Sequence, residues 1–223
     1  MTDNLKRFSE ICLPPEESHK FVQLVKKQGI NYDKGPSKVG FKEDWRIMDY
    51  LIESNNMESD IDENKNIKIY LTHHASLIPE KYWTEQMKKG AEHDLKKEGK
   101  LGSHFGCAAG DVIVVKNDIP FYLDNKISKN EVLITEKGNK YYTTGSIGEY
   151  SIKYFPNGDG RHFCLTFAKI PSQPDAKIYV VDMDALKEAV SKNEIQCKKF
   201  NNENIYIIQN IIKKIPEAVL ELN

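Results

Sequence analysis

Three residues near the middle of the chain have side chains that could act together on a phosphate group. Asp111 opens one apolar run, and Asp124 and Lys126 close the next, with a short polar stretch between the two runs. Mg²⁺ is usually held by one or two carboxylates together with waters and substrate phosphate. A neighbouring lysine can orient or deprotonate the attacking water. These residue types therefore predict metal-assisted hydrolysis at a phosphate.

A hairpin of two strands would bring the three side chains together. Successive side chains of a strand point to opposite faces, so Asp124 and Lys126 share one face while Asn125 points away. Pairing of the two apolar runs as a hairpin would place Asp111 alongside them. We therefore expect two carboxylates and one ammonium to converge at one end of this hairpin.

Asp111 and the sequence Asp124-Asn125-Lys126 resemble the motif of the PD-(D/E)XK nuclease superfamily, which has an acidic residue on one strand and (Asp/Glu)-x-Lys on the next. The resemblance spans roughly residues 80–185. It implies an α/β fold with a restriction-endonuclease-like core, in which helices flank a mixed central β-sheet. The expected order, a helix over residues 82–95, four strands and a helix from Asp184, fits that core.

The resemblance also implies roles for individual residues in Mg²⁺-dependent hydrolysis of DNA. Asp111 and Asp124 would hold the metal and the scissile phosphate, and Lys126 would position or activate the water. Glu92, from the preceding helix, would add a metal ligand and aid a metal-bound water, with Glu85 as the alternative. The metal lowers the pKa of the bound water and neutralises charge that develops on the phosphate.

Size and the lack of a helicase, zinc or helix-turn-helix motif make the chain look most like a type II restriction endonuclease. Such an enzyme would act as a homodimer on a short sequence of double-stranded DNA. A cognate methyltransferase would be its functional partner without forming a stable complex with it. This subtype is an analogy from size and fold, and fold alone does not fix function.

Three other interpretations stay open on the sequence. A structure-selective repair or recombination nuclease would use the same residues. A non-catalytic DNA-binding or interaction protein would carry Asp124 and Lys126 as surface charge at a hairpin end. A hydrolase with a Cys107/His162 nucleophilic pair is the third, since a lone cysteine and a distant histidine can meet in a fold.

Length and charge agree with a compact core without identifying a partner. The 223 residues predict an N-terminal helical part over residues 1–66 packed on a nuclease core over residues 67–223. The net charge of −1 gives no overall basic field, so a nuclease of this sequence must concentrate positive charge locally. Lysine doublets that could do so begin at Lys88, Lys96, Lys198 and Lys213.

Cysteine spacing and hydropathy predict a soluble, cytoplasmic protein. The four cysteines lack the Cys-x-x-Cys spacing of a zinc ribbon or redox pair, which indicates reduced thiols. The first residues have no apolar signal core, and no apolar stretch approaches the roughly 20 residues of a membrane span.

Apolar periodicity predicts most of the remaining elements. We expect helices over residues 14–27 and 41–53, a strand over 67–71, and strands over 162–170 and 177–181. Residues 138–161 either form loops that reach the substrate groove or contain an exposed hairpin over residues 141–154. The apolar run over residues 205–212 is a buried strand or a buried helix.

Overall fold

A computed structural model describes residues 1–12, 67–72, 78–99, 110, 112–126, 132–134, 140–142, 145–154, 158–168, 177–200 and 202–222. The helices predicted over residues 14–27 and 41–53 lie outside these residues, as do Cys107 and Asp111. The helices and strands follow in this order: α1 (Asp3–Cys12), β1 (Ile67–Leu71), η3 (Glu80–Tyr82), α4 (Glu85–Glu98), β2 (Val112–Lys116), β3 (Ile119–Lys126), β4 (Val132–Ile134), β5 (Lys140–Tyr142), β6 (Ser146–Gly148), α6 (Glu149–Tyr154), β7 (His162–Ala168), β8 (Lys177–Asp182), α7 (Met183–Ser191), β9 (Lys198–Phe200), β10 (Glu203–Ile207), α8 (Ile208–Lys214), η4 (Pro216–Ala218) and β11 (Val219–Leu222).

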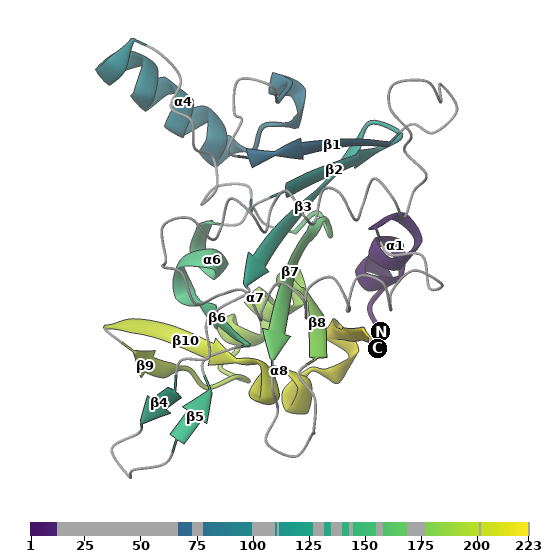
Figure 1. The fold of residues 1–223 in the computed structure, drawn as a ribbon, viewed down its shortest axis with the longest axis vertical. Coiled ribbons are helices and arrows are strands. Elements are labelled where there is room, and N and C mark those ends of the chain that lie inside the picture. The colour runs from purple at the N-terminus through teal and green to yellow at the C-terminus, as the bar shows by residue number, and fades with distance from the viewer. Residues whose placement is uncertain are drawn as a thin grey trace.

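The largest sheet in the described part of the chain is mixed. It has six strands in the order β1-β2-β3-β7-β8-β11 (Figure 1). β3 and β7 run parallel, and the other neighbours are antiparallel. The prediction of an α/β fold with a mixed sheet flanked by helices is confirmed at this level, and the predicted strands at residues 67–71, 162–170 and 177–181 are β1, β7 and β8.

The predicted hairpin is formed by β2 and β3. Asn117 and Asp118 connect the strands with φ angles of 52° and 62°, a left-handed pair whose twist matches that of the flanking strands. The Asp118 carboxylate accepts hydrogen bonds from the Tyr82 hydroxyl at 2.7 Å and the Lys81 ammonium at 2.9 Å. The register pairs Val112 with Leu123 at the open end, next to Asp124.

Two apolar clusters cover one face of the sheet. The first joins β2 and β3 to η3 and α4, and contains Ile113, Val115 and Tyr122 with Ile78, Tyr82, Met87 and Ala91. The second joins β7 and β8 to α7 and α8, and includes Cys164, Tyr179 and Val181 with Leu186, Ala189, Ile208 and Ile211. Asp124 follows the first cluster along β3 and pairs with Cys164 of the second, so it lies where the two clusters meet.

Helix α1 packs against the opposite face of the sheet (Figure 1). Leu5 and Phe8 are fully buried, and the Phe8 ring lies 4.9 Å from the ring of Phe163 on β7. The Thr2 amide donates to the Glu217 carbonyl at 2.8 Å, which joins the two ends of the chain. A helical N-terminal part was expected, but this helix was not singled out, although Leu5, Phe8 and Cys12 follow the i, i+3, i+7 spacing of a helix face.

The exposed hairpin considered for residues 141–154 is wrong. β6 pairs with the distant β10 rather than with its sequence neighbour, and residues Glu149–Tyr154 form the helix α6. The apolar run at residues 205–212 was expected to be a buried strand or a buried helix. It contains both, because strand β10 ends at Ile207 and helix α8 begins at Ile208. Ile208 begins this helix with its amide donating to the Gly145 carbonyl at 2.6 Å.

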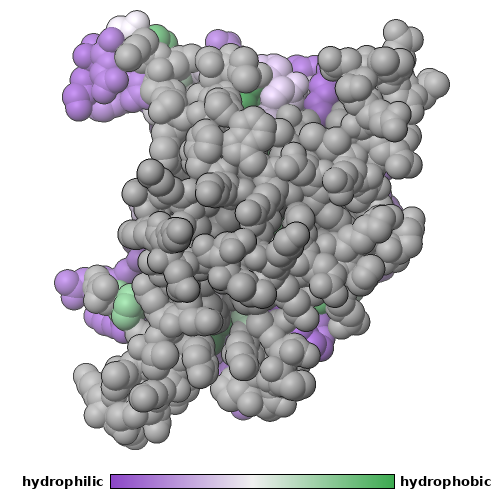
Figure 2. All heavy atoms as spheres, viewed as in Figure 1, coloured by the Kyte–Doolittle hydropathy of each residue, from purple (hydrophilic) through white to green (hydrophobic). Residues whose placement is uncertain are grey.

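None of the helices in the described ranges combines the length and the apolar character that crossing a membrane requires. The hydrophilic surface visible in Figure 2 is most concentrated at the end of α4. This helix extends away from the sheet (Figure 1), and Lys88, Lys89, Lys96 and Lys97 on it are all exposed.

Candidate functional site

Asp124 is a buried carboxylate near the end of β3. Its exposed fraction is 5 %, and its Oδ2 atom accepts a hydrogen bond from the Ser151 hydroxyl at 3.1 Å. Ser151 comes from helix α6 and is 6 % exposed. Because burial of a charged group is costly without polar partners, the fold places a helix hydroxyl beside this carboxylate.

Thr166 on β7 is a second buried hydroxyl on the same face of the sheet. β3 and β7 pair in parallel, with Asp124 opposite Cys164 and Lys126 opposite Thr166. Residues that pair directly across two strands point to the same face, and alternate residues of one strand share a face. Asp124 and Ser151 are in contact, and Thr166 is buried on the same face; we call these three residues the polar seam.

Lys126 is the last residue of β3, two positions after Asp124, and its side chain lies outside the described part of the structure. The two chain neighbours of Asp111 both lie against β3. Val112 pairs with Leu123, and a Cβ atom on Gly110 would collide with the Leu123 carbonyl. Gly110 has a φ of 78°, so a glycine is needed there for both conformation and space.

The structure does not bring Glu92 to Asp124 through any contact within the described ranges. Met87 and Ala91 form the buried side of α4, whereas Glu92 is exposed. Glu85 and Glu92 are seven positions apart, so both point in nearly the same direction, about 100° around the helix from Ala91. Glu85 forms an exposed ion pair with Lys88 at 2.7 Å, and the hydrogen bond from Lys88 lowers the pKa of the Glu85 carboxyl.

The oxygen atoms of the polar seam fit Mg²⁺ better than a softer metal. Zinc sites use cysteine and histidine ligands, whereas Mg²⁺ takes oxygen ligands and keeps several of its waters. Among the described residues, no three His, Cys, Asp or Glu side chains are grouped for a metal. The seam therefore offers one described carboxylate with two hydroxyls, a set that suits a cation still carrying most of its waters.

His162 is buried beside the seam and is uncharged at neutral pH. Its ring stacks on Tyr122 with the centroids 4.6 Å apart and an angle of 5° between the planes. Burial lowers the pKa of His162 to about 4, although the Asp159 carboxylate 3.5 Å away acts in the opposite direction. A fully buried ring of this kind is not placed to touch a substrate, and Cys107, its suggested partner, lies outside the described residues.

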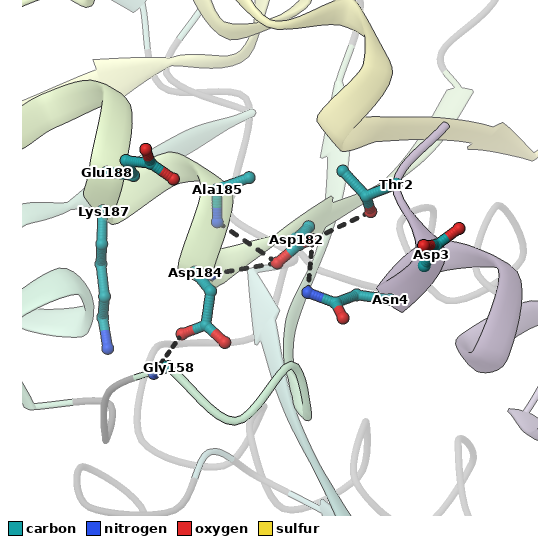
Figure 3. A pocket seen from close by; sticks show the side chains of 9 residues that line it. All are labelled: Thr2, Asp3, Asn4, Gly158, Asp182, Asp184, Ala185, Lys187 and Glu188. Atoms are coloured by element: carbon teal, nitrogen blue, oxygen red, sulfur yellow. Dashed lines mark hydrogen bonds between the residues drawn. The ribbon is translucent and has the colours of Figure 1, made fainter.

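A second polar site, missed from the sequence, lies at the start of α7 (Figure 3). It is a cavity of about 460 Å³ between the first turn of α1, the loop at Gly158 and the first turns of α7. Asp182 is 1 % exposed, and its carboxylate caps α7 by accepting from the amides of Asp184 and Ala185 at 3.1 and 3.3 Å. The Thr2 hydroxyl and the Asn4 amide group each donate to its other oxygen at 2.9 Å.

The lining of this cavity is held by internal hydrogen bonds. Asp184 accepts from the backbone amides of Gly158 and Gly160 at 3.0 and 2.7 Å. Gly160 has a φ of 68°, and a Cβ atom there would collide with Asn4. Burial lowers the pKa of Lys187 on the same wall. The sequence signal for the helix cap is Asp182, an aspartate between a predicted strand and a predicted helix. No local pattern indicates its hydrogen bonds to Thr2 and Asn4.

Comparisons of the chain with protein-family models, with curated proteins and with solved structures find no match. Inference about function therefore starts from the residues of the two sites themselves. The Asp182 site holds elements of the fold together. The polar seam combines a buried carboxylate with the strand that carries the Asp-x-Lys sequence.

Proposed function

We propose that this protein is a Mg²⁺-dependent DNA endonuclease with a restriction-endonuclease-like core. The observation that carries the proposal is the position of Asp124, which is a buried carboxylate on β3. This strand pairs antiparallel with β2 on one side and parallel with β7 on the other. Position 126 lies on the same face two residues further along. This is the arrangement in which an Asp-x-Lys sequence can serve one metal and one phosphate.

In this proposal Asp124 and Asp111 hold the cation and the scissile phosphate. The bound Mg²⁺ would lower the pKa of a coordinated water and offset negative charge in the transition state. Lys126 would orient or deprotonate the attacking water. Ser151 would fix the orientation of the Asp124 carboxylate through its 3.1 Å hydrogen bond.

Glu92 has an auxiliary place in the proposal. It is exposed on α4, so it would contribute to the metal site only after DNA had brought this helix and the seam together. Glu85 is the weaker candidate because it already pairs with Lys88. Asp111, Asp124 and Lys126 therefore form the minimal proposed site.

Double-stranded DNA is the proposed substrate, and α4 is the element best placed to supply positive charge. Four exposed lysines lie on a helix that extends away from the sheet (Figure 1). Lysines that neutralise phosphates release condensed counterions, so binding should weaken steeply with salt. A homodimer would present two such helices to the two halves of a symmetric duplex site, as expected for a type II restriction endonuclease.

A non-catalytic DNA-binding or interaction protein is the second candidate. It is favoured by the hydrogen bond between Ser151 and Asp124, because a carboxylate that serves only the fold would also be buried against a hydroxyl. The two candidates differ in the Lys126→Ala variant. Loss of Lys126 should abolish cleavage in a nuclease, and it should leave a purely structural Asp124 undisturbed.

The proposal is tested by incubating the protein with long unmethylated DNA in Mg²⁺ or in EDTA, alongside Lys126→Ala. Discrete bands that require Mg²⁺ and disappear in the variant would establish a sequence-specific endonuclease. A smear would favour a non-specific nuclease, and cleavage restricted to branched substrates would favour a repair or recombination enzyme. Intact DNA across duplex, branched and single-stranded substrates would refute the nuclease proposal.

A further inference from the structure

Thr166 has a buried hydroxyl that lacks a hydrogen-bond partner within the described part of the chain. Its side chain is fully buried on β7, in the middle of the sheet. Buried hydroxyls are nearly always paired with protein or with an ordered water, and an unpaired one indicates a missing water, an ion or a functional role. A valine has the same shape without this cost, so packing alone does not explain a threonine here.

The hydroxyl lies on the face of the sheet that carries Asp124. Thr166 pairs with Lys126, two residues beyond the pair formed by Asp124 and Cys164. Strands about 4.8 Å apart that rise about 3.3 Å per residue place the Cα atoms of Asp124 and Thr166 about 8 Å apart on the diagonal. Two short side chains at this separation do not reach each other, so a group that bonds both must lie between them.

We infer that Thr166 is a positioning residue of the polar seam, whose hydroxyl binds a water of the cation held by Asp124. The inference rests on the proposed function, because it assigns Thr166 to the same Mg²⁺ site. Mg²⁺ keeps several waters when it binds to protein, and hydrogen bonds to those waters tune its affinity. Such a water can donate to the Thr166 oxygen.

Two variants isolate the hydroxyl from the rest of the side chain. Thr166→Val removes the oxygen and keeps the shape, whereas Thr166→Ser keeps the oxygen and removes a methyl group. The readout is the rise of the melting temperature with Mg²⁺ concentration, measured without DNA. We expect Thr166→Val to need about 10-fold more Mg²⁺ than the wild type for the same rise in melting temperature. This is the lower end of the loss in metal affinity that follows replacement of an outer-shell hydrogen-bond partner. Thr166→Ser should stay near the wild-type value.

Without Mg²⁺, Thr166→Val should melt at or above the wild-type temperature, because the substitution removes an unpaired buried polar group. This separates a role in binding from simple damage to the core. If Mg²⁺ does not shift the wild-type melting temperature, the Mg²⁺ concentration for half-maximal DNA cleavage gives the same comparison of the three proteins.

The outcomes distinguish this inference from the proposed function. Wild-type cleavage together with an unchanged Mg²⁺ requirement in Thr166→Val would overturn the role of Thr166 and leave the nuclease proposal in place. A wild-type protein with neither a response to Mg²⁺ nor cleavage would overturn the nuclease proposal, and the role of Thr166 with it.

Discussion

Two buried aspartates of this protein, Asp182 and Asp124, lie in different parts of the fold. Asp182 accepts two backbone amides at the start of α7 and two side-chain donors from α1. Asp124 accepts the hydroxyl of Ser151 and lies on the same face as the hydroxyl of Thr166. A backbone amide has a fixed direction, whereas a hydroxyl can rotate to donate elsewhere.

Under the proposed function, Asp182 is a carboxylate that stabilises the fold and Asp124 is one that binds a cation. Four donors occupy both oxygens of Asp182, so a metal there would have to displace the helix cap and the contact with α1. At Asp124 a hydroxyl can turn toward another acceptor while the strands keep their pairing. We therefore expect changes at Asp182 to affect stability and changes at Asp124 to affect chemistry.

Replacement of Asp182 should have the largest effect on stability. Loss of a helix N-cap costs about 1–2 kcal/mol, and each of the two lost side-chain hydrogen bonds to this charged acceptor costs about 1.5 kcal/mol, so Asp182→Ala should lower the free energy of unfolding by about 4–5 kcal/mol. Urea unfolding measures this difference. Asp182→Asn is the matched control and should lose less, because asparagine is also a good N-cap. A loss under about 1 kcal/mol in the alanine variant would contradict the role given to Asp182.

Acid should weaken the fold through His162, which lies on β7, the strand between those of the two aspartates. Its pKa is lowered from 6.5 to about 4 by burial, so the unfolded chain binds a proton between these values that the folded protein does not. Stability from this residue is complete above about pH 6.5 and is lost as the pH falls toward 4, by on the order of 3 kcal/mol.

His162→Phe keeps a ring to stack on Tyr122 and cannot titrate. Urea unfolding at a series of pH values between 4 and 7 should show a shallower dependence on pH in this variant than in the wild type. The same slope in both proteins would show that other groups cause the acid sensitivity.

Replacement of Thr2 should have the smallest of the three effects. Thr2→Val removes the donor to Asp182 and the acceptor of the Leu5 amide, which should cost about 1–2 kcal/mol. Thr2→Ser keeps the hydroxyl and should behave like the wild type in the same urea experiment. A loss in Thr2→Ser with none in Thr2→Val would mean that the methyl group, and not the hydroxyl, matters at this position.

Local patterns predicted the centre of the sheet. The hairpin of β2 and β3, the strands β7 and β8 and the helix α7 all follow from apolar runs and turn residues close together in sequence. β6 and α6 were missed because β6 is held by pairing with β10, about 60 residues later. Such pairings depend on the assembled fold and leave no periodic pattern in the strand itself.

The sequence likewise predicted only part of the candidate site. Asp124 stands out because its strand and its Asp-x-Lys spacing are local features. Ser151 and Thr166 were not singled out, since isolated hydroxyl residues are common and their burial depends on α6 and β7 meeting β3. The link between Thr2 and Asp182 spans 180 positions, so no local pattern could indicate it.

The most direct test compares Mg²⁺-dependent cleavage of DNA by the wild type, Asp124→Asn and Asp182→Asn, below the melting temperature of each. We predict that Asp124→Asn lowers the cleavage rate by at least about 10³-fold, as loss of a group that stabilises transition-state charge does, and that Asp182→Asn cleaves at the wild-type rate. Cleavage by Asp124→Asn as fast as by the wild type would contradict a catalytic role for Asp124.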